Sequence, residues 1–172
     1  AWTRTPSTQG DMTMTGTKNV GVGSSSLIAN TTGNSNNAVG NEALSKNTTG
    51  RFNNALGTGA LFSNVTGQSN EAIGVSTLNN NTYGSFNVAI GNSALYGNTG
   101  ATNTVAIGME AAAGDYASYN SEKGVYVGRG AGYNVQTGSD NNTFIGYQAG
   151  FNNTTGASNI VIGSNVSVAS TT

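Results

Sequence analysis

Residues Asn87–Leu95 read Asn-Val-Ala-Ile-Gly-Asn-Ser-Ala-Leu, and close relatives of this stretch recur along most of the chain. The glycine of the stretch returns every seventeen residues from Gly23 to Gly108, then after twenty at Gly128, eighteen at Gly146 and seventeen at Gly163. A short, fixed period with one apolar–glycine step per unit is typical of stacked coils that contact only their neighbours. We therefore predict an all-β fold, a parallel β-roll or β-solenoid of about nine seventeen-residue coils.

The composition argues against several functions. Charged residues make up 8% of the 172 residues, and the net charge is -1. Nucleic-acid binding needs clustered basic residues, which are missing here. The chain has no histidine and no cysteine, so the commonest general base and the commonest metal ligands are missing too. We therefore expect no enzyme activity and no cofactor. Because no run of about 18 apolar residues occurs, we also expect no membrane insertion.

Disorder is the alternative that a polar, glycine-rich composition raises. Hydrophobic residues make up 35% of the chain, however, and they occur at fixed places in the repeat. The aliphatic residue before each glycine is never polar, so we expect it to face the core. This predicted core set is Val39, Leu56, Ile73, Ile90, Ile107, Val127, Ile145 and Ile162.

A second core position lies four residues after the glycine, where most coils carry leucine. This set is Leu44, Leu61, Leu78 and Leu95. Each coil is then expected to contain two short strands and two turns. The alanine between the strand positions, such as Ala89, is expected on the opposite face, because side chains alternate along a strand. A column of small alanines lets another chain approach closely, which favours side-by-side association, most simply as a parallel trimer.

Asparagines recur in two columns, one before the strand and one before the Thr-Thr-Gly turn. Stacked amides form hydrogen-bonded ladders, and this is the structural interpretation of both columns. The second column also falls in Asn-x-Ser/Thr sequons, which are acceptors for N-glycosylation in a secreted protein. The candidate glycosylation sites, one per coil, are Asn30, Asn47 and Asn64.

The repeat divides the chain into three parts. Residues 1–11 form an N-terminal extension or cap, 12–163 the β-roll, with an irregular coil and insertion at 109–128, and 164–172 a C-terminal tail. The open end of a coil stack exposes unpaired strand edges. The two terminal segments are therefore interpreted either as caps and linkers or as segments that pair with the end of the next molecule.

The irregular region departs from the repeat in a correlated way. Ala112, Gly132 and Gly150 stand where leucine is expected, while Tyr126 and Phe144 stand in the alanine column. One interpretation is that aromatic rings fill the interior in place of the lost leucines. The alternative is a glycan-binding surface on the protruding loop, because aromatic faces stack on sugars and loops on rigid scaffolds often carry binding residues. Its candidate residues are Asp115, Tyr116, Tyr119 and Tyr133.

The Asn-x-Ala-Ile-Gly-x-x-Ala unit at Asn87–Ala94 resembles the head repeat of trimeric autotransporter adhesins of the YadA type. The longer form, with Ala-Leu-x-x-Asn-Thr-Thr-Gly, is similar to shaft repeats of phage tail fibres. This resemblance covers about residues 12–165 and implies left-handed parallel β-rolls assembled as parallel trimers. The seventeen-residue coil is longer than the usual adhesin unit, so at least one of its turns is expected to be longer.

The resemblance implies an extracellular location or one on the surface of a cell or virion. The predicted function is a non-enzymatic fibre or adhesin segment that acts as a spacer and binds a glycan or protein receptor on a host surface. One alternative is a glycosylated filament subunit that polymerises end to end. A second alternative is an ice-binding solenoid, because Thr31, Thr48 and Thr154 begin Thr-Thr pairs that recur along the stack.

Overall fold

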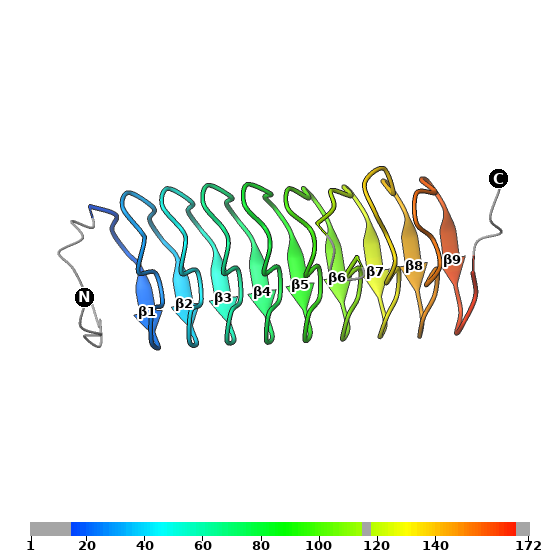
Figure 1. The fold of residues 1–172 in the computed structure, drawn as a ribbon, viewed down its shortest axis with the longest axis horizontal. Helices are drawn as coiled ribbons and strands as arrows, with labels where there is room; N and C mark the ends of the chain where they lie inside the picture. The colour runs from blue at the N-terminus through cyan, green and yellow to red at the C-terminus, as the bar shows by residue number, and fades with distance from the viewer. Residues whose placement is uncertain (1–14, 115–117, 168–172) are drawn as a thin grey trace.

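The computed structural model describes residues 15–114 and 118–167, and these form an all-β solenoid of about eight turns (Figure 1). Nine parallel strands make one sheet in chain order, so β1 and β9 are its two outer strands. The fold class predicted from the repeat is confirmed at this level. The strands are β1 (Val20–Val22), β2 (Asn37–Val39), β3 (Asn54–Leu56), β4 (Glu71–Ile73), β5 (Val88–Ile90), β6 (Val105–Ile107), β7 (Val125–Val127), β8 (Thr143–Ile145) and β9 (Ile160–Ile162).

The strands pair with identical repeat positions opposite one another. Ala55 pairs with Ala72 and Ala72 with Ala89, so each position of the repeat forms a straight column. Each strand ends at the repeat glycine, where the backbone turns away with positive φ. Gly74, for example, has φ +135°, and a Cβ built on it would lie 2.6 Å from the carbonyl oxygen of Gly91. The glycine is therefore required both by its conformation and by the close approach of the next coil.

The wall opposite the sheet is built from turns, which corrects the prediction of two strands per coil. Residues 41–46 and the equivalent segments are turns among the described residues. Glu42 and Leu44 adopt left-handed backbone conformations, with φ 59° and 50°. Leu44 still donates its N–H to the carbonyl of Ala60 in the next coil, at 3.0 Å. Coil-to-coil hydrogen bonds thus hold bulky residues in a conformation that they seldom adopt alone.

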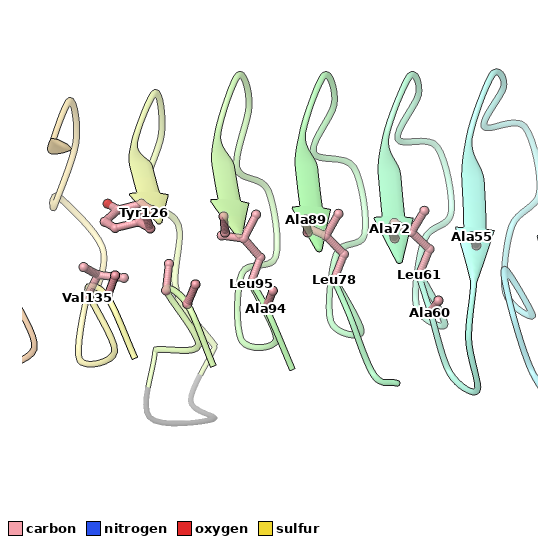
Figure 2. Close-up of a cluster of buried hydrophobic side chains, with 14 of the residues drawn as sticks. Ala55, Ala60, Leu61, Ala72, Leu78, Ala89, Ala94, Leu95, Tyr126 and Val135 are labelled. Carbon is pink, nitrogen blue, oxygen red and sulfur yellow. The ribbon is translucent and has the colours of Figure 1, made fainter. Parts of the chain in front are cut away.

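The interior lies between the strand alanines and the turn leucines (Figure 2). Leu44, Leu61, Leu78 and Leu95 are fully buried, as expected of core residues. The assignment of the two strand faces is wrong, however, because the alanine column points inward and the aliphatic residue before the glycine points outward. The residues predicted to be core but found exposed are Val39, Leu56, Ile73, Ile90, Ile107, Ile145 and Ile162, and Val127 is half-buried.

The inward direction of the alanines and the outward direction of the larger aliphatic residues have a steric cause. A three-residue strand faces a turn wall that already carries a leucine, so the narrow interior has room only for a methyl group from the strand. In two of the coils that lack the leucine, the strand side chain is larger. Tyr126 and Phe144 are fully buried, and Cβ atoms built on Gly132 and Gly150 would lie 2.5 Å from their respective rings. The two rings meet edge to face, with centroids 5.6 Å apart. The interpretation that aromatic rings replace leucine inside the coil is therefore confirmed.

The irregular coil fills its interior with a residue from the insertion. Tyr119 is buried, and its ring lies where a Cβ on Gly114 would be, 2.1 Å from the Tyr119 ring. The Tyr119 hydroxyl donates to the carbonyl of Ala112. Burial raises the pKa of both Tyr119 and Tyr126 above the usual tyrosine value, because the phenolate would lose its hydration.

The two asparagine columns form buried ladders that tie neighbouring coils together. In the column before the strand, Asn53 Oδ1 accepts the backbone N–H of Asn70 at 3.1 Å, and Asn53 Nδ2 donates to the carbonyl of Gly67 at 2.9 Å. In the other column, Asn64 Nδ2 donates to Asn47 Oδ1 at 2.8 Å. Amide side chains therefore satisfy buried backbone groups at the corners where the strand hydrogen bonding stops.

Candidate assembly surface on the outer face of the sheet

An unbroken column of aliphatic side chains follows the outer face of the sheet from β1 to β9. It is formed by the third residue of each strand, the residue before the repeat glycine. Most members expose more than a third of their surface; Leu56 is 51% exposed and Ile73 40% exposed. We call this set the aliphatic column, and it comprises Val22, Val39, Leu56, Ile73, Ile90, Ile107, Val127, Ile145 and Ile162.

The first residue of each strand points to the same outer face, because side chains alternate along a strand. In β2 to β4 these residues are polar and bonded to one another. Asn37 Nδ2 donates to Asn54 Oδ1 and Asn54 Nδ2 donates to Glu71 Oε1, each at 2.6 Å. In β5 to β7 they are Val88, Val105 and Val125. The apolar surface is therefore one residue wide over β2 to β4 and two residues wide over β5 to β7.

This face is almost free of charge. Glu71 is the only charged residue in the strands, and its carboxylate accepts the Asn54 amide. A contiguous apolar surface of several hundred Å² is uncommon on a monomeric soluble protein and usually marks an interaction site. The rigid spacing of the coils also presents its side chains in a regular array. These properties suit packing against another flat, periodic surface.

The residues predicted to bind glycans on the inserted loop are not brought together on the surface. Asp115 and Tyr116 lie outside the described residues. Tyr119 is a buried filler of the interior, so it is not a ligand contact. Tyr133 is half-buried and stacks on Phe151, with centroids 5.0 Å apart and rings 4° from parallel. The part of this candidate site that the structure describes is therefore engaged in internal packing.

The candidate glycosylation residues are also internal. Asn30, Asn47 and Asn64 are fully buried, and each donates its amide nitrogen to a carbonyl three residues ahead. A glycan is attached through this nitrogen, which has no room for a sugar inside the ladder. The sequons at these positions therefore reflect the repeat and not sites of modification on the folded coil.

The threonine columns are partly used for coil stacking. Thr31 and Thr48 donate their hydroxyls to carbonyls of the following coil, at 3.0 and 3.1 Å. Val65 interrupts the column at the next coil. An ice-binding surface of regularly spaced hydroxyls is therefore not favoured at this position, because two of its hydroxyl protons are directed along the stack.

Sequence reasoning missed the aliphatic column because it placed these residues inside. The signal that reveals their true position is the exchange in the irregular region. Tyr126 takes the place of alanine in the same coil where Gly132 takes the place of leucine. Two positions that exchange volume share one space, so alanine and leucine both line the interior and the remaining strand residues point outward.

Within the described ranges no group of three potential metal ligands occurs. Helices that would suffice to cross a membrane are likewise missing from the part of the chain that the structure describes. Comparison with known proteins found no matching family model, no matching curated protein and no matching solved structure.

Proposed function

We propose that this chain is a segment of a non-enzymatic extracellular fibre or adhesin, in which parallel copies pack side by side through the aliphatic column to form a trimer. The observation that carries the proposal is the continuity of this column along all nine strands. The aliphatic column takes the role that the sequence suggested for the alanine column, because the alanines are buried inside the coils.

The physical argument begins with the energetics of a thin rod. Most coils bury a small strand side chain and one leucine, and three of the others bury one aromatic ring, so the interior is narrow for the surface that each coil exposes. Burying half-exposed aliphatics against a second copy adds about 25 cal/mol for each Å² removed from water. Because the coil spacing is the same in every copy, parallel copies match along their whole length. Such a rod suits a spacer that holds a receptor-binding part away from a surface.

The test is the mass of the assembly in solution, measured by analytical ultracentrifugation or light scattering. The proposal predicts three times the monomer mass of 17.3 kDa. The variant Ile90→Lys together with Ile107→Lys places charge in the aliphatic column where it is widest. We expect this double variant to sediment as a monomer, because two buried ammonium groups per copy lack partners.

The matched control is Asn103→Lys, on an exposed corner of the same coil as Ile107. Lys18 and Lys123 occupy the equivalent place in other coils, so the fold accommodates lysine there. This control is expected to keep the trimer mass. A wild-type chain that sediments at 17.3 kDa, or a control that dissociates as readily as the double variant, contradicts the proposal.

A second candidate function is the filament that grows end to end. The observation that favours it is the exposure of the outer strand β9, where Ile160 is 75% and Ile162 67% exposed, well above Ile73 at 40%. Among the described residues no strand pairs with the outer edge of β9, and such an edge accepts a further parallel strand in the same register. A filament gives a mass that rises steadily with protein concentration, whereas the trimer gives a plateau.

A further inference from the structure

A separate column at one corner of the coils carries two exposed phenylalanines. Phe52 and Phe86 stand five residues before their repeat glycines, and each is 52% exposed. Their backbone N–H groups donate to the preceding coil, Phe52 to Asn34 and Phe86 to Gln68, at 3.1 and 3.0 Å. The two residues therefore occupy equivalent rungs of the same rigid stack.

These phenylalanines are not explained by folding. Their φ angles are 58° and 61°, a left-handed conformation in which bulky side chains are outliers. Other coils place smaller or more flexible polar residues at this position, namely Lys18, Ser35, Ser69, Asn103, Lys123, Asn141 and Ser158. The left-handed backbone belongs to the repeat, because every coil has it at this position. The feature peculiar to these two coils is therefore the half-exposed aromatic ring, and exposed apolar surface of this kind often marks an interaction site.

The surroundings of the two rings are polar and nearly uncharged. Ser69, from the coil between them, is a small residue. Gln68 lies next to Ser69, and its backbone N–H donates to Ser85 Oγ at 3.1 Å, which ties it to the following coil. Tyr83, in the same coil as Phe86, is 57% exposed, but its ring lies over Gly100 of the following coil, on the side away from Phe52. Arg51, beside Phe52, is the one charged group among these residues.

We propose that Phe52 and Phe86 form a binding site for an extended β-1,4-linked glycan. Two coil steps separate Phe52 from Phe86, about 10 Å at the usual strand spacing. This is close to the length of one disaccharide unit in such a glycan, so the two rings meet every second sugar. The apolar face of a sugar packs on an aromatic ring, and the equatorial hydroxyls along the edges of the glycan are left to water and to polar neighbours such as Gln68. The site does not depend on the proposed assembly through the sheet.

The test uses the full chain and soluble tetrasaccharides, cellotetraose and chitotetraose, with binding measured by calorimetry or by NMR titration. The α-linked maltotetraose and the matching β-linked disaccharides are the comparison ligands. We expect a β-linked tetrasaccharide to bind at least about tenfold more tightly than its disaccharide, because only the longer chain spans both rings. Maltotetraose, which curves, is expected to bind as weakly as the disaccharides.

The decisive variants are Phe52→Ser and Phe86→Ser, because serine is the natural residue at this place in neighbouring coils. Each is expected to lower the affinity for the tetrasaccharide at least about tenfold. Each should leave the thermal unfolding midpoint unchanged or raise it, since serine fits the left-handed backbone better than phenylalanine. The control Tyr147→Ser removes an exposed ring from a different corner and should leave sugar binding unchanged.

Three results would overturn the site. The first is that neither β-linked tetrasaccharide binds better than maltotetraose. The second is that Phe52→Ser and Phe86→Ser bind sugar as well as the wild type. The third is that these variants lower the unfolding midpoint or the mass of the assembly, which would assign the rings to packing within the chain or between copies.

Discussion

At the scale of the residue, buried amides and positive φ angles hold this solenoid together. The asparagine ladders satisfy backbone groups at corners where strand pairing stops, and leucines with φ near 50° place their side chains in the interior. The asparagine ladders and the left-handed leucines both depend on the adjacent coil, because that coil supplies hydrogen-bond partners that an isolated coil lacks. Removing one such residue therefore breaks several hydrogen bonds at once.

Replacing Asn53 by alanine tests this dependence. The change leaves the N–H of Asn70 without its amide partner, while the carbonyl of Gly67 loses one of its two amide donors and keeps Asn64 Nδ2. We expect a loss of about 1–3 kcal/mol in unfolding free energy, the usual cost of one buried unpaired group. The measurement is chemical denaturation followed by circular dichroism. Asn37→Ala, on the exposed face, is the control and should change stability by only about 0.5 kcal/mol. Equal effects of the two variants would contradict the ladder's role.

The buried tyrosines predict a loss of stability in alkali. Burial raises the pKa of Tyr119 and Tyr126 in the folded chain above the usual tyrosine value. The unfolded chain therefore releases these protons first as pH rises, and stability falls above about pH 10 while it is unaffected by these groups below that value. The unfolding midpoint, followed from about pH 9 upward, is the measurement.

A matched variant separates this effect from general alkaline unfolding. Tyr126→Phe removes one of the two groups, and Phe144 shows that phenylalanine fits this place in the next coil. We expect the variant to lose less stability than the wild type over the same rise in pH. An identical pH dependence in both proteins would show that Tyr126 does not titrate on unfolding.

At the scale of the element, the short strand has two faces with opposite roles. The alanine column is inside and the aliphatic column outside, although both are apolar and either one is compatible with a period of two. Leu78→Ala should therefore cost about 2–5 kcal/mol, because it opens a cavity in a narrow interior. Ile73→Ala should cost less than about 1 kcal/mol in the monomer, because the side chain is already partly in water. Denaturation of both variants under monomeric conditions compares them, and a larger loss for Ile73→Ala would contradict the assigned faces.

The spacing between coils gives a second prediction at this scale. A Cβ on Gly74 would lie 2.6 Å from Gly91, whereas a Cβ on Gly138 meets nothing within 4 Å; both residues have positive φ. Gly138→Ala should cost about 1–3 kcal/mol from backbone strain alone. Gly74→Ala should cost clearly more, because the next coil must also move away. Thermal denaturation of the two variants isolates the steric part, and equal losses would show that coil contact does not require this glycine.

At the scale of the whole molecule, the rod presents a face along its length that is largely apolar and carries one strand charge, Glu71. Association through this face should therefore depend little on ionic strength, because surface electrostatics is what salt screens. We expect the sedimenting mass to stay constant across a tenfold rise in sodium chloride concentration. Dissociation of the assembly by moderate salt would point instead to an interface made of charged side chains.

The repeat explains which parts of the fold could be predicted from the sequence. The seventeen-residue period by itself determined a stack of parallel coils, because each unit is too small to bury its apolar residues alone. The buried leucines, the amide ladders and the exchange of leucine for an aromatic ring in the interior followed from the same pattern. The left-handed roll remains a prediction from resemblance, and the trimer a prediction from resemblance and from the expected packing of apolar columns.

The tertiary structure alone decided which apolar column faces inward. A strand of three residues offers two apolar faces, and local sequence does not distinguish them. The width of the interior makes the choice: leucines projecting from the turn wall leave space for methyl groups on the strand, so the larger Val, Leu and Ile side chains are directed outward. Tyr119 is decided in the same way. It was predicted to contact a ligand, but it lies in the interior, where it fills the volume that the missing leucine leaves.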